Sequence, residues 1–397
     1  MLGGNGKINI LFLMMQMEMG GAERLVHTLA GSLDRTIFTP SVAWFQGKRA
    51  LKAFQDLEVP LHHIPKIKRV DFTAMKRLSG IIEENNIHIV NAHHFMPLVY
   101  SFYGSKIAHS GKLFCTIHSE WEVESLALKW RIAGNLLLKQ ADGIIGVNEL
   151  VSQAARDTFR LDPAKSFTIH NGVDLAAFAH GNRKAALRKQ LGIAAGDKII
   201  GVVANLKKIK NHILLLRAFS ELIKDMGNVS LILVGQGFTS DPDNTEPEIR
   251  SFISGENLGG KALLLGYRAD IPDLLGIMDI FCLPSLKEGL PIGLIEAMAA
   301  GLPVVGTSVE GIRDVIKPGR NGFLVAPGDV AALKRLLHTL LNDDSLRYTL
   351  GQESRYLAKS AYSLDQCISK YEQLFRASLQ VPPADMPYAG LGTISGH

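Results

Sequence analysis

The chain has 397 residues, of which 47% are hydrophobic and 20% are charged, and its formal net charge at pH 7 is +5. This composition is typical of a soluble globular protein, and the length predicts two domains because it exceeds what one ordinary core supports. The charge is too small to indicate a nucleic-acid partner, although it is compatible with an anionic membrane surface or an anionic substrate.

The first half of the chain predicts short buried strands separated by amphipathic helices. Residues 8–15 are too few to span a bilayer, follow only Lys7 and precede no small-residue cleavage site, so we expect a strand there and not a signal peptide. Further apolar runs predict strands at residues 39–44, 87–91, 113–117, 143–147 and 166–169. Helical spacing predicts helices such as 22–33 and 72–85.

A second series of the same kind follows a polar, alanine-rich stretch. Its strands are predicted at residues 198–204, 230–234, 262–265, 280–283, 303–307 and 322–325. Alternating strands and helices indicate α/β domains with parallel sheets. With a turn signal at Asn171-Gly172, we predict a first domain of residues 1–175, a linker of residues 176–197 and a second domain of residues 198–362.

The end of the chain divides into a helix and a tail. Residues 363–380 predict a last helix, in which Ile368, Tyr371, Leu374 and Phe375 recur at helical spacing. Residues 381–397 are rich in Pro and Gly, and they are predicted to be disordered.

The cysteines indicate a reducing compartment. Cys115, Cys282 and Cys367 are far apart and fit no metal-ligand spacing. Cys115 and Cys282 lie in apolar, strand-like runs, where they are expected to be buried and reduced. A cytosolic protein is therefore expected.

The most informative segment is residues 286–305, where Glu288 and Glu296 lie eight residues apart with Gly289, Pro291 and Gly293 between them. Pro291 suits a first helical turn, which predicts a helix over residues 291–300 with unpaired N–H groups that form an anion site. A carboxylate would be repelled by that anion, so each glutamate is expected to bind hydroxyl groups. The alternative is a buried helix whose glutamates are solvated or capping.

This Glu-x7-Glu segment, Ser-Leu-Lys-Glu-Gly-Leu-Pro followed by Glu-Ala-Met-Ala-Ala-Gly-Leu-Pro-Val-Val, resembles the retaining glycosyltransferases of the GT-B group 1 family, also called family 4. The resemblance extends over about residues 8–378. It implies two Rossmann-like, doubly wound domains that face each other across a cleft, with the last helix crossing back to the first domain. It also implies a nucleotide-sugar donor on the second domain, without indicating which sugar is moved.

The resemblance also implies roles for this segment. Glu288 would hold hydroxyl groups of the transferred sugar, and Glu296 those of the ribose. Backbone N–H groups at the helix start would hold the diphosphate, near Gly289, Ile292, Gly293 and Leu294. Retention of configuration could use Glu288 as a covalent nucleophile, but the resemblance favours front-face attack, in which the leaving phosphate oxygen helps to remove the acceptor proton.

Gly20 and Gly21 follow the first predicted strand in the order Gly-Gly-Ala-Glu. The resemblance implies that they let the donor diphosphate approach the backbone, although a tight turn alone would also explain them. A dinucleotide-binding oxidoreductase is disfavoured, because no Gly-x-Gly-x-x-Gly follows this strand and Gly235-Gln236-Gly237 leads into a polar loop.

A basic segment follows the strand predicted at residues 198–204. The resembled family usually carries an arginine where this chain has Asn205, and a lysine that matches Lys210. A fixed cation stabilises the charge that a leaving nucleoside diphosphate gains. Lys210 is therefore predicted to be catalytic and donor-binding, and Lys207 to supply the charge missing at Asn205. The alternative is a solvated basic loop.

Histidines end two predicted strands at the sheet edge where α/β proteins bind ligands. His118 matches a family histidine near the transferred sugar, and it is predicted to be catalytic by hydrogen bonding a sugar hydroxyl or polarising the reacting centre. The alternative is a structural histidine. His93 and His94 are predicted on the acceptor side, with their side chains on opposite faces of the strand.

No metal or other cofactor is expected. No Asp-x-Asp lies near a predicted strand end, and Asp241-Pro-Asp243 lies in a hydrophilic loop. The lysines and the helix start would supply the positive charge that a nucleotide-sugar needs, and the resemblance points the same way.

The acceptor is expected on the first domain, which carries a basic surface among apolar residues. Such a surface suits an anionic leaflet and a lipid-linked saccharide, although a solvated surface is the alternative. Its basic residues are Lys48, Arg49, Lys52, Lys66, Lys68, Arg69, Lys76 and Arg77.

These features predict a retaining hexosyltransferase that moves a sugar from a nucleoside-diphosphate sugar to a saccharide or lipid-linked acceptor. Cell-surface polysaccharide or glycolipid synthesis at the cytoplasmic face of the membrane is the expected setting. Two alternatives remain, since fold alone does not determine reaction: a sugar phosphorylase or nucleotide-sugar epimerase, and a catalytically silent sugar-nucleotide-binding protein.

Overall fold

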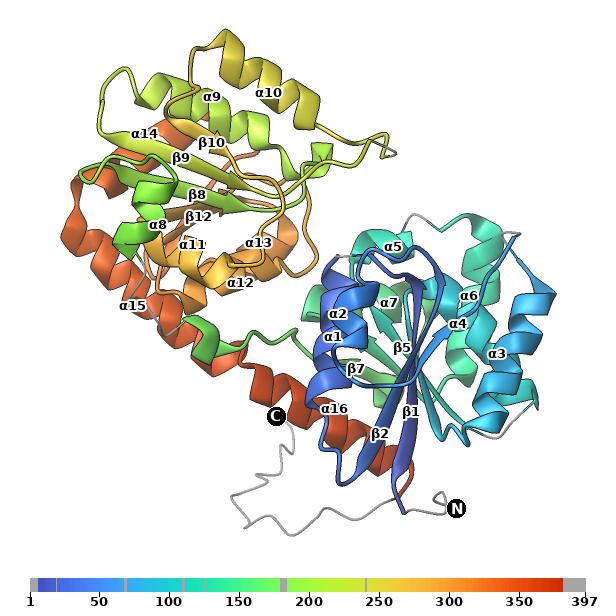
Figure 1. Ribbon diagram of the computed structural model, residues 1–397. Helices are drawn as coiled ribbons and strands as arrows, with labels where there is room; N and C mark the ends of the chain where they lie inside the picture. Colours follow the sequence, from blue (N-terminus) through green and yellow to red (C-terminus); the bar gives the residue numbers. More distant parts are fainter. Residues whose placement is uncertain are drawn as a thin grey trace.

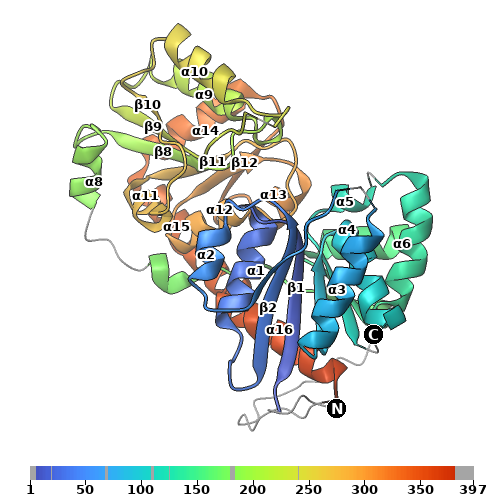
Figure 2. The ribbon, with the colours of Figure 1, turned by 45° about the vertical axis from the view of Figure 1, so that its right-hand side comes forward.

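The structure, a computed structural model, describes residues 6–18, 20–67, 70–108, 111–124, 126–178, 184–239 and 241–380. These residues form two α/β domains, each with helices packed on both faces of one parallel sheet (Figures 1 and 2). This arrangement confirms the predicted fold class. The tail predicted to be disordered, residues 381–397, lies outside the described residues.

The described part of the first domain contains a seven-stranded sheet in the order β3-β2-β1-β4-β5-β6-β7. Most residues of the central strand β1 are buried, as expected for a parallel strand whose sheet is covered by helices on both faces. The strands are β1 (Ile8–Gln16), β2 (Phe38–Gln46), β3 (Leu61–His63), β4 (Ile89–His93), β5 (Lys112–Ile117), β6 (Gly143–Gly146) and β7 (Ser166–Thr168). The helices are α1 (Gly21–Ser32), α2 (Leu51–Gln55), α3 (Phe72–Glu84), α4 (Phe95–Phe102), α5 (Glu120–Glu124), α6 (Leu128–Gln140) and α7 (Glu149–Phe159).

The described part of the second domain repeats this plan with a six-stranded sheet in the order β10-β9-β8-β11-β12-β13. Its strands are β8 (Lys198–Val203), β9 (Val229–Val234), β10 (Ala262–Leu264), β11 (Ile280–Leu283), β12 (Val304–Thr307) and β13 (Gly322–Val325). The helices are α8 (Lys184–Gln190), α9 (His212–Leu222), α10 (Glu246–Gly255), α11 (Ile271–Ile277), α12 (Ile292–Ala299), α13 (Glu310–Val315), α14 (Val330–Asn342) and α15 (Asp344–Ala361).

Two features differ from the sequence prediction. Strand β3 has only three residues, two of which are histidines, so no apolar run marks it. The segment predicted as a linker, residues 176–197, contains α8, and Leu187 and Ile193 are both 7% exposed. These side chains are buried, so the packed part of the second domain begins before residue 198.

The last helix, α16 (Leu364–Ser378), crosses back to the first domain, as the resemblance implied (Figure 1). Tyr371 and Phe375 are fully buried in the first-domain core. The Phe375 ring packs edge-on against Phe114 of β5 with centroids 5.4 Å apart. The chain passes between the two domains twice, near Val173 and near Tyr362. These two connecting segments run side by side, because Val173 N–H donates to Tyr362 O at 2.9 Å and Val173 O accepts from Leu364 N–H at 3.0 Å.

Both sheets reverse their winding direction in the middle, between β1 and β4 in the first domain and between β8 and β11 in the second. Open α/β sheets bind ligands at the carboxyl ends of strands beside such a reversal. Loops that follow β5, β8 and β11 contribute residues to one cavity between the two domains. The topology therefore places the candidate site between the sheets.

Replacing Phe375 with alanine should destabilise the first domain by about 3–5 kcal/mol, because the lost ring leaves a cavity beside Phe114. Urea unfolding followed by circular dichroism measures this loss. Gln373→Ala, an exposed neighbour on α16, is the matched control and should be nearly neutral. Equal stability of the two variants would show that the Phe375 ring does not hold α16 to the first domain.

Candidate active site

The loop between β11 and α12 forms one wall of the cavity. It is anchored by a hydrogen bond from Leu286 N–H to Ile209 O at 2.7 Å. Glu288 in this loop is only 8% exposed, and its Oε1 accepts from Ser285 Oγ at 2.6 Å. Lys210 Nζ lies 2.7 Å and 2.8 Å from the two carboxylate oxygens. Glu288 and Lys210, both predicted from the sequence, are thus a direct ion pair.

Gly289 brings the two domains into backbone contact. Its carbonyl oxygen accepts from Asn148 Nδ2 at 2.7 Å, and Asn148 caps the start of α7 in the first domain. A Cβ on Gly289 would lie 2.4 Å from the carbonyl oxygen of His118. Only glycine allows this approach, so His118 faces the start of α12 across the cavity.

The start of α12 agrees in part with the predicted anion site. Pro291 is the N-cap, and Ile292 and Gly293 line the cavity. Gly293 packs on the end of β8, where a Cβ would lie 2.7 Å from Val203 O. The prediction for Leu294 is wrong, because its N–H donates to Pro291 O at 3.0 Å and its side chain is fully buried.

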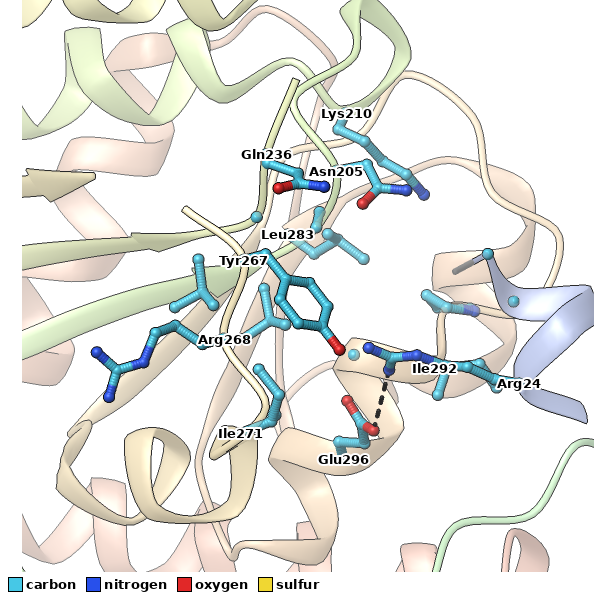
Figure 3. Close-up of a pocket in the computed structure, with 18 of the residues that line it drawn as sticks. Arg24, Asn205, Lys210, Gln236, Tyr267, Arg268, Ile271, Leu283, Ile292 and Glu296 are labelled. Atoms are coloured by element: carbon cyan, nitrogen blue, oxygen red, sulfur yellow. Dashed lines mark hydrogen bonds and ion pairs between the residues drawn. The ribbon is translucent and has the colours of Figure 1, made fainter. Parts of the chain in front are cut away.

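Glu296 lies further along α12 and is contacted from the first domain. Arg24 Nη1 lies 3.4 Å from Glu296 Oε1 (Figure 3). Burial raises the pKa of Glu296, and the positive charge of Arg24 opposes that shift. The other oxygen, Oε2, is buried without a hydrogen-bond partner among the described residues. A buried acceptor without a partner is costly, so this oxygen is suited to a ligand hydroxyl.

The basic segment after β8 is only partly directed at the cavity. Asn205 and Lys210 line it from the second domain (Figure 3). Lys207 is not among the lining residues, and its Nζ pairs with Asp241 Oδ2 at 2.7 Å. The prediction that Lys207 supplies the missing charge at Asn205 is therefore wrong, because Asp241 holds that lysine outside the cavity.

The cavity measures about 540 Å³ and takes residues from both domains. The predicted residues among its lining are Gly20, Gly21, His118, Asn205, Lys210, Glu288, Gly289, Ile292, Gly293 and Glu296. Lining residues that the sequence analysis did not assign to the donor site include Arg24, Arg49, Gln236, Phe238, Tyr267 and Arg268. Arg24 could have been assigned to the site from the sequence, because it directly follows Gly-Gly-Ala-Glu. The other residues are brought together only by the fold.

Part of the predicted basic surface belongs to this cavity. The Arg49 guanidinium lies 4.1 Å from the ring centroid of Phe238, so a cation–π contact joins the two domains. Lys52 also lines the cavity. Lys68 and Arg69 lie outside the described residues. The expected acceptor surface is therefore divided between the cavity and the remaining exposed residues.

Three histidines gather at the carboxyl ends of β4 and β5. His93 Nδ1 lies 3.0 Å from His118 Nε2, and the His94 and His118 ring centroids are 4.7 Å apart. The prediction that His93 and His94 point to opposite faces is wrong. His94 leaves the strand with φ 76° and ψ 163°, a conformation rarely adopted by residues with a side chain. Both line a second cavity, of about 490 Å³, in the first domain.

Glu122 binds one member of this histidine cluster. It accepts from His94 Nδ1 at 2.9 Å and from Phe95 N–H at 2.6 Å. Burial alone would lower the pKa of His94, but the Glu122 carboxylate raises that pKa overall. Burial, then the charges of His94 and His93, lower the pKa of His118 well below its usual value. His118 is therefore neutral near pH 7 and can exchange a hydrogen bond with a ligand.

The described part of the chain contains neither a metal-binding cluster nor a membrane-spanning helix. No group of three or more His, Cys, Asp or Glu side chains there has an arrangement that could hold a metal ion. Cys115 and Cys282 are free and buried, as predicted, and Cys367 is also free and buried. Within the same residues, no helix has the length and apolar character needed to cross a bilayer.

Two family models match the chain, one for each domain. The model described as "Glycosyltransferase Family 4" matches residues 19–177, and the model described as "Glycosyl transferases group 1" matches residues 183–356. The chain belongs to the group 1 glycosyltransferases. The matched ranges correspond to the two α/β domains and include both walls of the cavity.

Named relatives and a solved structure extend this finding. N-acetyl-alpha-D-glucosaminyl L-malate synthase of Bacillus anthracis is 24% identical over 331 residues, which are 81% of this chain and 83% of the relative. N-acetylgalactosamine-N,N'-diacetylbacillosaminyl-diphospho-undecaprenol 4-alpha-N-acetylgalactosaminyltransferase of Campylobacter jejuni is 27% identical over 356 residues, or 86% and 92% of the two chains. The crystal structure of Anabaena Alr3699/HepE with UDP and glucose superposes with a TM-score of 0.83 at 22% identity, covering 93% of this chain and 100% of that one. This likeness confirms the GT-B fold.

Replacing Gly289 with alanine should reduce kcat/KM of this glycosyltransferase by about tenfold or more, because its Cβ would displace His118 from the start of α12 and small misplacements are costly. Steady-state transfer kinetics check this. Gly255→Ala on α10, where a Cβ meets nothing within 4 Å, is the control. Similar kinetics in the two variants would contradict the proposed importance of this interdomain contact.

His93 should make the stability of this glycosyltransferase depend on pH. Burial, with the charge of His94, lowers its pKa from 6.5 to about 3. The unfolded chain therefore binds an extra proton between pH 6.5 and about 3, and stability that is full above pH 6.5 is lost as the pH falls. His93→Gln should reduce the slope of unfolding free energy against pH by up to about 1.4 kcal/mol per unit. Urea titrations at several pH values measure it, and an unchanged slope would contradict the assignment.

Proposed function

We propose that this protein is a retaining glycosyltransferase that moves a sugar from a nucleoside-diphosphate sugar to a saccharide or lipid-linked acceptor. The observation that carries the proposal is the convergence of the Lys210–Glu288 pair and the start of α12 on one wall of the cavity, opposite His118. An ammonium group beside free helix-terminal N–H groups suits a diphosphate. Carboxylates nearby suit the hydroxyl groups of a sugar and a ribose.

Leaving-group stabilisation is the main task of the second domain in this proposal. Breaking the bond to the sugar increases the negative charge on the diphosphate, and positively charged or N–H groups fixed in advance lower that barrier. Lys210 and the N–H groups near Gly289, Ile292 and Gly293 are suitably placed on one wall. We propose that this charge stabilisation requires no bound metal.

The hydrogen bonds and ion pair of Glu288 favour front-face attack over a covalent intermediate as the route to retention of configuration. Its Oε1 accepts from both Ser285 and Lys210, and its Oε2 lies against Lys210. These interactions stabilise the carboxylate charge, which makes Glu288 a weak nucleophile but a rigid acceptor for sugar hydroxyls. Neutral His118, on the opposite wall, would exchange a hydrogen bond with the same sugar.

The remaining part of the proposal concerns the acceptor and its location. The Campylobacter relative acts, by its name, on a diphospho-undecaprenol carrier, which supports a lipid-linked acceptor and a role in cell-surface polysaccharide or glycolipid synthesis. Free buried cysteines fit a reducing compartment. We therefore place the protein in the cytoplasm, in peripheral contact with the inner face of the membrane.

A thermal-shift panel of UDP-, GDP-, ADP- and CMP-sugars and their free nucleotides tests the donor class, because a ligand that binds only the folded state raises Tm. One nucleotide series should raise Tm equally with magnesium or with EDTA. The absence of a shift with every nucleotide would refute the proposed donor, and a shift that required magnesium would refute metal-independent binding.

Glu296→Ala should raise the KM for the identified donor by about 10- to 100-fold, because hydrogen bonds to a charged group contribute about 1.5–3 kcal/mol. Steady-state kinetics at saturating acceptor measure this change. Glu248→Ala, an exposed glutamate of α10, is the control. Donor kinetics equal to wild type in Glu296→Ala would remove Glu296 from the donor site.

A further inference from the structure

Helix α6 presents an apolar stripe to the outside of the first domain. Leu128, Ile132 and Leu136 recur every four residues and are 73%, 59% and 68% exposed. At about 3.6 residues per turn, the three side chains fall on one side of the helix. Singly exposed apolar residues are ordinary, whereas an aligned set on one face indicates an interaction surface.

The core does not require these side chains, because another face of α6 packs on the domain. The Trp130 ring lies edge-on to Phe95 with centroids 6.2 Å apart, and Leu138 is buried. At Gly134 a Cβ would lie 2.6 Å from the Phe159 ring, so the helix is already as close as its backbone permits. Both views show α6 at the outer edge of the domain (Figures 1 and 2).

The residues beside the stripe are basic. Lys129, Arg131 and Lys139 are all exposed, and α6 contains neither Asp nor Glu. Lys129 and Arg131 lie on the two sides of the stripe at helical spacing, and Lys139 lies beyond its end. A helix with an apolar face bordered by Lys and Arg is suited to the interface of an anionic bilayer.

A second exposed apolar pair lies in the same domain. Ile67 and Phe72 are 95% and 75% exposed. Lys66, next to Ile67 in the sequence, lines the cavity of about 490 Å³ that Trp130 of α6 also lines.

We propose that α6 lies on an anionic membrane surface, with Leu128, Ile132 and Leu136 inserted among the lipids and its basic side chains on the lipid phosphates. The assignment deepens the proposed function and rests on it for the acceptor. The neighbouring cavity is lined both by Trp130 of α6 and by His94 and Glu122 of the histidine cluster. A carrier lipid held in that surface would thus meet a cavity that begins beside the helix.

Charge favours a membrane over a second copy of the chain as the occupant. A twofold contact between two α6 helices would bring Lys129, Arg131 and Lys139 of both copies to one interface, and α6 offers no Asp or Glu to pair with them. Like charges in contact would oppose such a dimer. An anionic lipid surface, in contrast, neutralises all three.

Flotation of the full chain with vesicles tests the proposal. At about 0.15 M salt, the protein should float with vesicles of equal parts phosphatidylglycerol and phosphatidylcholine, and much less with phosphatidylcholine alone. The triple variant Leu128→Ser/Ile132→Ser/Leu136→Ser should reduce the bound fraction at least about tenfold. Replacing Lys129, Arg131 and Lys139 with Gln should weaken binding by about fivefold per residue.

The matched control replaces exposed apolar side chains elsewhere. Tyr348 and Tyr356 of α15 are 70% and 60% exposed in the second domain, and Tyr348→Ser/Tyr356→Ser should float like wild type. Failure of wild type to float with anionic vesicles, or equal flotation of the α6 serine variant, would overturn the proposal. A dimer seen by light scattering and lost in that serine variant would also overturn it, by assigning the stripe to a second copy.

The donor-induced thermal shift, measured on the same proteins, separates this proposal from the proposed function. It should be unchanged in the α6 serine variant, because α6 contributes no residue to the donor cavity. A wild-type protein that floats but shows no shift with any nucleotide would refute the proposed function and support the membrane surface. A protein that shows the shift but does not float would support the proposed function and refute the membrane surface.

Discussion

The approach of the second-domain backbone to the first domain at Gly289 is the contact on which the geometry of the cavity depends. The His118 carbonyl and the Asn148 side chain both meet Gly289 directly. Within the second domain, a Cβ on Gly311 would lie 2.0 Å from the Gly289 carbonyl oxygen. The loop that carries Glu288 therefore packs closely against backbone of both domains. Because Gly289 approaches His118 backbone to backbone, the start of α12 and the end of β5 have little freedom to shift relative to each other.

The two glutamates of the cavity form ion pairs with partners from different domains. Glu288 is paired with Lys210 from its own domain, so that pair does not depend on how the domains are arranged. Glu296 is contacted by Arg24 from the other domain, so separation of the domains would break that contact. One end of the cavity is thus preorganised within the second domain, and the other end is completed only when the first domain is in place. Under the proposed function, the binding of a ribose by Glu296 would therefore depend on the position of the first domain.

The first domain contributes a neutral imidazole through an unusual backbone. His94 adopts φ 76° and ψ 163°, which costs free energy in a residue with a side chain. Hydrogen bonds from His94 and from the Phe95 N–H to Glu122 offset that cost. The turn places the His94 ring beside His118, with the ring centroids 4.7 Å apart. Burial first, and then the charges of His94 and His93, lower the pKa of His118 well below its usual value. His118 is therefore uncharged near pH 7, as its proposed hydrogen bond to a sugar hydroxyl requires.

The sequence by itself determined the fold class, because apolar runs of strand length and amphipathic stretches of helix length depend only on local spacing. The resemblance of its motifs to the group 1 family also pointed to Glu288, Glu296, Lys210 and His118, and all four line the cavity. Only the tertiary structure decided which groups meet. Lys207 lies next to the basic loop in sequence but is held by Asp241, the amide of Leu294 is used within its own helix, and Arg49 reaches Phe238 across the domains. Such contacts depend on side-chain direction and on long-range packing, and neither is encoded in the spacing of residues along the chain.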